Sequence, residues 1–269
     1  MADIDLHTHS RFFHAFPGRP TWYDKFGAQL LVATARARGL DGIAITNHDY
    51  YTDFDLPTGD LTVLPGIEIS TTAGHLLLVG PDPPTSTKPN GISPEEAVAL
   101  ARERGCAVVM AHPYRNSHIK DLDVPVDAVE VNGKRSGPTT VLEELAAQRD
   151  LPLVGGSDAH FPNEVGRAFA TVDVESVTPE NVARAIRDGR TEFRVMDRFP
   201  DQYIRRLYGI VHRLKGHTEP DTTAGEGGPA SVTRTTLDGK GGEPSELRPE
   251  KQLTKGDERT ETEQDSPTD

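Results

Sequence analysis

The stretch Asp5-Leu6-His7-Thr8-His9-Ser10 decides how the chain is interpreted. Its apolar start predicts a short β-strand over residues 4–7. Side chains along a strand alternate between two faces, so His7 and His9 are expected to point the same way. Two imidazoles on one face are good ligands for Zn, Mn or Fe. A lone pair of this kind is more often a surface accident, so the later segments decide between the two interpretations.

Length and composition limit the class of protein. The chain has 269 residues, which suits one large domain such as an α/β barrel. The formal net charge of −13 argues against sequence-independent binding to nucleic-acid backbones. The sequence has no 18-residue apolar run, no signal-peptide pattern at its start and one cysteine, Cys106. We therefore expect a cytoplasmic protein with no membrane partner.

The composition changes near Gly216. From residue 217 to residue 269 there is no Phe, Trp or Tyr, and the apolar residues are isolated. Such a segment cannot bury enough apolar surface to offset its chain entropy. The sequence thus predicts a folded domain over residues 1–215 and an acidic disordered tail over residues 216–269. Whether the tail binds a partner stays open.

Strand-like and helix-like runs alternate through the first domain. Strands are expected over residues 4–7, 42–46, 61–64, 67–69, 75–79, 107–111, 128–131, 151–154 and 168–172. Helices are expected over residues 26–38, 94–104, 140–149, 178–188 and 201–214. The alternation predicts an α/β fold with a parallel sheet. Some strands follow one another with no helix between them, so a regular eight-fold barrel is not expected.

Histidines gather around the predicted strand ends. They are His7, His9, His14, His48, His75, His112 and His160. His75 is the exception in placement, because it opens its strand. In barrel enzymes the active site lies at the carboxyl ends of the strands. Each histidine alone could be a core or surface residue, but the joint set predicts a metal site.

Acidic residues join the histidines. Asp158-Ala159-His160 repeats the one-residue spacing of the first motif, with a carboxylate in the first place. Glu68 lies inside an apolar run, where a carboxylate is costly to bury unless it is paired or bound to metal. We therefore expect Glu68 to bridge two metal ions. Pro113 follows His112 and is expected to end the strand and hold the histidine in extended geometry.

These motifs resemble, in order, the PHP (polymerase and histidinol phosphatase) domain from about residue 3 to about residue 190. They are His7-x-His9, Thr46-Asn47-His48-Asp49, Gly66-Ile67-Glu68, His75, Ala111-His112-Pro113 and Ser157-Asp158-Ala159-His160. The resemblance implies a distorted (βα)7 TIM-like barrel with three divalent metal ions at the strand ends. It implies these ligand sets: His7, His9, Glu68 and Asp158; Glu68, His75 and His112; His14, His48 and His160. Some relatives have an aspartate where this chain has His14, and aspartate is frequent in place of Asn47.

The resemblance also implies an enzyme that hydrolyses phosphate esters. Hydroxide between two cations would attack phosphorus in line with the leaving alcohol. Asp158, or a neighbouring histidine such as His160, is expected to move a proton. Arginine suits the remaining phosphate oxygens, and the candidates are Arg115, Arg11, and Lys134 or Arg135.

Three functions stay open. The favoured one is a phosphoesterase that acts on a small phosphorylated metabolite or nucleotide. The second is a nuclease or DNA-repair phosphodiesterase with the same metal centre, and here nucleic acid enters only as a substrate. The third is a metal-binding structural subunit with no turnover. The acidic composition and the lack of a basic strip favour the first, and the complete ligand set disfavours the third.

Overall fold

The computed structural model describes residues 1–11, 19–115, 117–135 and 138–196. Three sequence predictions lie outside these residues: the helix over residues 201–214, the tail over residues 216–269 and the position of His14. Among the described residues, no helix has both the length and the apolar character to cross a membrane.

One sheet of nine strands forms the centre of the described part. The strands are β1 (Ala2–Thr8), β2 (Gly42–Ile45), β3 (Thr62–Thr71), β4 (Gly74–Val79), β5 (Ala107–Met110), β6 (Ala128–Asn132), β7 (Leu153–Gly156), β8 (Ala168–Val172) and β9 (Thr191–Val195). Their order is β7-β6-β5-β4-β3-β2-β1-β8-β9. Strand β7 also lies against β1, β8 and β9, so the sheet curves round and nearly closes. The predicted TIM-like barrel is confirmed.

The strand directions correct the expected parallel sheet. Strands β4 and β8 run antiparallel to both of their neighbours, while the other neighbouring pairs are parallel. The reversal of β4 explains its direct connection to β3, because antiparallel neighbours need only a short turn. Strand β9 was not predicted. Its sequence is mostly polar and its side chains are partly exposed, as suits an edge strand.

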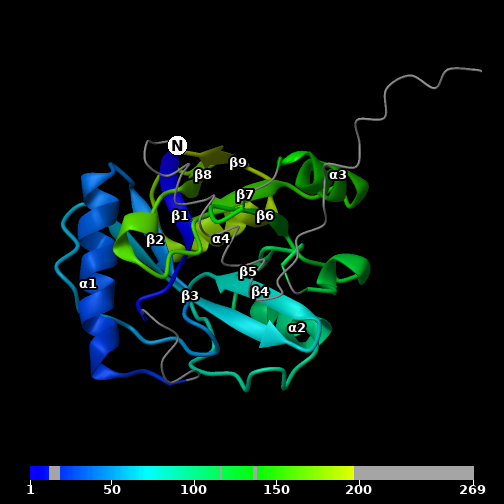
Figure 1. Ribbon diagram of the computed structural model, residues 1–269, viewed down its shortest axis with the longest axis horizontal. Coiled ribbons are helices and arrows are strands. Elements are labelled where there is room, and N and C mark those ends of the chain that lie inside the picture. The colour runs from blue at the N-terminus through cyan, green and yellow to red at the C-terminus, as the bar shows by residue number, and fades with distance from the viewer. Residues whose placement is uncertain (12–18, 116, 136–137, 197–269) are drawn as a thin grey trace, which may run out of the picture. The chain divides into compact units, whose positions relative to one another are not determined.

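Within the described residues, four α-helices cover the sheet: α1 (Trp22–Ala37), α2 (Pro94–Glu103), α3 (Thr140–Gln148) and α4 (Pro179–Arg187). Helix α1 packs on β2, α2 on β3 to β5, α3 on β6 and β7, and α4 on β5 and β8 (Figure 1). Two short 3₁₀ helices lie at Ile119–Asp121 and Pro162–Glu164. Helix α1 begins four residues before the predicted start, because Thr21 and Asp24 form a capping box.

Strand β3 corrects the prediction of two strands that flank Pro65 and Gly66. Residues Thr62 to Pro65 pair with β2, and residues Gly66 to Thr71 pair with β4. Pro65 is thus the last residue that pairs with β2, where its missing backbone N–H costs little. One strand crosses the point where its partner changes, and this carries Glu68 past the end of β2.

The interior of the curved sheet is apolar away from the site. Its largest members include Ile4, Leu6, Leu64, Leu77 and Val154, and helix α4 adds Val182 and Ile186. Gly155 lets the sheet close, because a Cβ there would lie 2.1 Å from the carbonyl oxygen of Phe169 in β8. The apolar filling and this close contact hold the strand ends that carry the histidines.

Candidate metal centre

Eight of the nine predicted metal ligands meet at one end of the sheet. They are His7, His9, His48, Glu68, His75, His112, Asp158 and His160. His14 is the ninth and lies outside the described residues. His75 joins the cluster although it stands near the start of its strand. Because β4 runs antiparallel to β3, the start of β4 lies beside the end of β3, where Ser70 pairs with His75.

His7 and His9 reach the cluster through an irregularity in β1. Ile4 and Leu6 belong to the interior apolar cluster, and yet His7 also faces inward and contacts Glu68. The pairing of β1 with β2 shifts register between Asp5 and Thr8. A break of this kind re-aims the side chains that follow it.

Glu68 is the centre of the histidine cluster. Its Oε2 lies 3.2 Å from Nε2 of His7 and 3.0 Å from Nδ1 of His48. Its Oε1 lies 2.7 Å from Nδ1 of His75 and 3.0 Å from Nε2 of His112. Burial raises the pKa of Glu68, but His48, His7 and His75 outweigh it and lower the pKa well below its usual value. Nε2 of His9 also lies 3.3 Å from Oε2. A buried ionised carboxylate among five imidazoles has the form that a bridging ligand needs.

Asp158 is the second buried carboxylate of the cluster. Its Oδ1 lies 3.3 Å from Nε2 of His9 and 3.2 Å from Nδ1 of His160. Its Oδ2 pairs with the guanidinium of Arg115. Burial raises the pKa of Asp158, but Arg115 and Lys134 outweigh it and lower the pKa well below its usual value. The carboxylate is therefore ionised and faces both histidines and cations.

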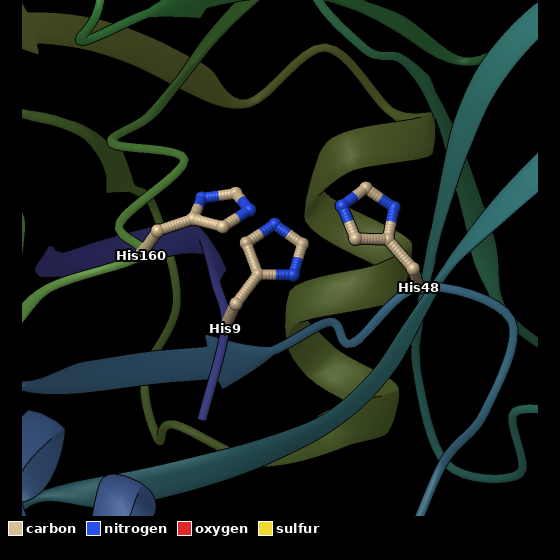
Figure 2. Close-up of side chains that lie close together, drawn as sticks. All are labelled: His9, His48 and His160. Carbon is tan, nitrogen blue, oxygen red and sulfur yellow. The ribbon is translucent and has the colours of Figure 1, made fainter. Parts of the chain in front are cut away.

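Figure 2 shows a group of three histidines, in which the ring of His9 lies between those of His160 and His48. The ring centroids of His9 and His48 are 4.6 Å apart, and those of His9 and His160 are 4.2 Å apart. Their candidate ligand nitrogens lie within 4.8 Å of one another. Burial lowers the pKa of His48 to about 3. Burial, His160 and His48 lower the pKa of His9 well below its usual value. Neutral imidazoles keep the lone pair that binds metal.

The donor set fits a divalent cation. Ligand atoms of His7, His9 and Glu68, and those of His48, Glu68 and His75, also lie within 4.8 Å of one another. Burial lowers the pKa of His7, but Glu130, Glu68 and Asp158 outweigh it and raise the pKa well above its usual value. The negative charges of these carboxylates thus favour a positive charge at Nε2 of His7. A metal ion could supply that charge, and imidazole with carboxylate suits Zn, Mn or Fe.

The three predicted phosphate-binding arginines have different surroundings. Arg115 contacts Asp158 and is thus part of the cluster. Arg11 pairs with the buried Asp24 at 2.9 Å, and its guanidinium lies over the ring of Tyr50. Arg135 donates from Nε to the carbonyl oxygen of Pro138 at 3.0 Å. The structure brings Arg115 to the histidines and engages the other two arginines elsewhere.

Lys134, the alternative to Arg135, does reach the cluster. Its Nζ lies 2.8 Å from Nδ1 of His160 and 3.5 Å from Oδ1 of Asp158. Its side chain is only 9% exposed, and it also approaches Glu164, at 3.8 Å. Lys134 and Arg115 therefore place two cationic groups beside Asp158.

Sequence reasoning missed Glu130. Its Oε1 lies 2.7 Å from Nδ1 of His7, and its Oε2 accepts the backbone N–H of His112 at 2.8 Å. Like Glu68, Glu130 is a carboxylate inside an apolar strand, and this pattern is the signal that predicts it. The extended geometry expected for His112 is wrong, because its φ is +27°. Glu130 holds the backbone N–H of His112 in that conformation.

The described residues thus form a curved α/β barrel with histidines and carboxylates at its strand ends. PsfC from Pseudomonas syringae has a similar structure, with a TM-score of 0.61 and 17% identity over 80% of this chain and 98% of that one. A two-domain Bacteroides vulgatus protein that contains a predicted PHP-like metal-dependent phosphoesterase has a TM-score of 0.52 and 19% identity. The similarity covers 77% of this chain and 69% of that one. The lesion-specific endonuclease PfuEndoQ from Pyrococcus furiosus has a TM-score of 0.50 and 18% identity, and the similarity covers 71% of this chain and 57% of that one.

The PHP-associated family model matches residues 142–191, the segment from α3 to the start of β9 that contains Asp158 and His160. No curated protein matches the chain. The match covers one segment of the chain, and the three solved structures, each below 20% identical, share its fold.

Proposed function

We propose that this protein is a metal-dependent phosphoesterase that hydrolyses phosphomonoesters of small metabolites or nucleotides. The arrangement of Glu68 carries the proposal, since this buried carboxylate contacts His7, His48, His75 and His112. Its Oε2 faces His7 and His48, and also His9 at 3.3 Å, while its Oε1 faces His75 and His112. This is the arrangement expected of a ligand shared between two cations.

The proposed ligands are His7, His9, Glu68 and Asp158 for one cation, and Glu68, His75 and His112 for a second. His14, His48 and His160 are the proposed set for a third. Divalent cations, when bound, supply Lewis-acid charge and lower the pKa of water towards neutrality. The histidines and carboxylates of this chain would determine the positions of those cations.

Arg115 and Lys134 are the groups that would bind and orient the phosphate. The side chain of Arg115 is 22% exposed while it touches Asp158, so it can reach a ligand that enters from solvent. A guanidinium can contact two phosphate oxygens at once. Lys134 lies 2.8 Å from Nδ1 of His160, and we assign to Lys134 the transfer of a proton to the leaving alcohol.

A phosphodiesterase that acts on nucleic acid is the second candidate. The similarity of the fold to a lesion-specific endonuclease favours it. The net charge of −13 opposes a long contact with a nucleic-acid backbone. The charge therefore favours a small substrate over a duplex.

Hydrolysis of a panel of phosphomonoesters, mononucleotides and short oligonucleotides with Zn, Mn or Fe tests the proposal. We expect release of phosphate from small monoesters, and loss of turnover in His7→Ala and Asp158→Ala. His118→Ala, in an exposed position, is the matched control and should keep full activity. Cleavage of oligonucleotides alone would favour the second candidate. No hydrolysis by fully metal-loaded protein would support a structural subunit.

A further inference from the structure

Glu130 joins two segments of the metal centre that come from different strands. One carboxylate oxygen contacts the side chain of His7, which lies in β1, at 2.7 Å. The other accepts the backbone N–H of His112, which follows β5, at 2.8 Å. Asn132 donates to that same oxygen from Nδ2 at 3.1 Å. The side chain of Glu130 is fully buried, so these contacts replace the water that it has lost.

We infer that Glu130 is a positioning residue that fixes which nitrogen of His7 faces the metal centre. Two of the partners of Glu130, the backbone N–H of His112 and Nδ2 of Asn132, donate to it, and an ionised carboxylate can only accept hydrogen bonds. Nδ1 of His7 must then carry a proton. Its Nε2, at 3.2 Å from Glu68, is left as the atom that binds a cation. A carboxylate behind a histidine ligand orients the ring and raises its basicity.

The same carboxylate supports the second ligand through the backbone. His112 has a φ of +27°, a conformation that costs free energy for any residue except glycine. The hydrogen bond from its N–H to Glu130 compensates part of this cost and directs Nε2 towards Glu68, at 3.0 Å. Loss of Glu130 would thus affect the ligands proposed for two different cations.

Space for Glu130 depends on Gly156 in β7. A Cβ at Gly156 would lie 2.5 Å from Oε1 of Glu130 and 2.6 Å from Cβ of His7. Three strands, β1, β6 and β7, therefore meet at this one hydrogen bond.

The test is the zinc affinity of Glu130→Gln, measured by competition with a chelating dye. The inference rests on the metal centre of the proposed function, but the affinity is measured without turnover. The amide keeps the shape and can present N–H where Nδ1 of His7 needs an acceptor. We expect zinc affinity to fall about 10- to 100-fold. An affinity equal to that of the wild type would overturn the inference.

Asp127→Asn is the matched control. Asp127 lies next to the same strand, at its other end. Its carboxylate accepts the backbone N–H of Val108 in β5 at 2.7 Å and pairs with Arg102 at 2.7 Å. This variant removes a similar contact away from the cluster, so its zinc affinity should equal that of the wild type. An equal loss in both variants would indicate a general effect of β6 and overturn the inference.

A second measurement needs no change at Glu130. Nitrogen-15 NMR of zinc-loaded wild-type protein, with the His7 signals assigned through a His7→Asn variant, reports the ring tautomer. We expect a proton on Nδ1, and a proton on Nε2 alone would overturn the inference. Zinc binding and this tautomer without hydrolysis of any ester would reject the proposed function and leave the role of Glu130 standing.

Discussion

Gly155→Ala should destabilise the fold at the place where the sheet closes. A Cβ at Gly155 would lie 2.1 Å from the carbonyl oxygen, 2.4 Å from the carbonyl carbon and 2.7 Å from the nitrogen of Phe169. All three are backbone atoms of β8, so no side chain can turn aside. Either β7 or β8 must move by about an ångström. Overpacking of this kind costs about 1–3 kcal/mol, and a backbone clash belongs at the upper end.

Thermal unfolding of metal-free protein, followed by far-ultraviolet circular dichroism, measures this cost. A loss of about 3 kcal/mol lowers Tm by roughly 6–12 °C in a domain of this size. Gly189→Ala is the control, because Gly189 has a φ of +68° and its Cβ would meet nothing within 4 Å. That variant should lose only about 1 kcal/mol from backbone strain. If Gly155→Ala lowers Tm no more than Gly189→Ala does, the close contact between β7 and β8 is wrong.

Three further predictions concern charge and metal. Chelation should lower Tm by about 5–11 °C, since a ligand at 100 times its Kd adds about 2.7 kcal/mol, and a Tm unaffected by chelation would contradict metal binding to the folded state. Arg115→Ala should lower kcat/KM for a phosphomonoester about 100-fold, whereas Arg104→Ala, which removes a surface pair with Asp82, should not change it. Burial raises the pKa of Asp24, but Arg11 and the Thr21 backbone outweigh it and lower the pKa. The stability of the wild type over Asp24→Asn should therefore be full above about pH 4 and disappear as the pH falls through the lowered pKa. Urea unfolding at several pH values measures it, and a difference that grows in acid would refute the assignment.

Most of the fold and much of the cluster follow from local sequence patterns. Apolar runs bounded by glycine or proline gave the positions of eight strands within a few residues, with β3 divided in error. The buried carboxylate Glu68 was identified because an unpaired charge in an apolar strand is costly. The His-x-His and Asp-x-His spacings predicted that each pair shares a face. In the structure, His7 and His9 reach the cluster through the register shift in β1, and Asp158 follows β7 with a φ of +53°.

The remainder depends on contacts that the sequence does not display. The predicted sheet was parallel because a strand pattern carries no direction, and the reversal of β4 explains why His75 can join the cluster from the start of a strand. His112 has a φ of +27°, and its backbone N–H donates to the side chain of Glu130, 18 residues away in the chain. Proline at position 113 predicts the opposite conformation, so tertiary contacts override the local preference here.

The closure of the sheet also explains why the first and last motifs act together. Thr8 and Ala159, the middle residues of His7-x-His9 and Asp158-x-His160, form a parallel bridge. The N–H of His9 donates to the carbonyl oxygen of Ala159 at 2.8 Å, and the N–H of Ala159 donates to that of His7 at 3.3 Å. The two pairs are thus held in register by backbone hydrogen bonds between segments about 150 residues apart in the chain. The same closure that stabilises the barrel aligns His9 with Asp158, so a variant that opens it should lose metal affinity as well as stability.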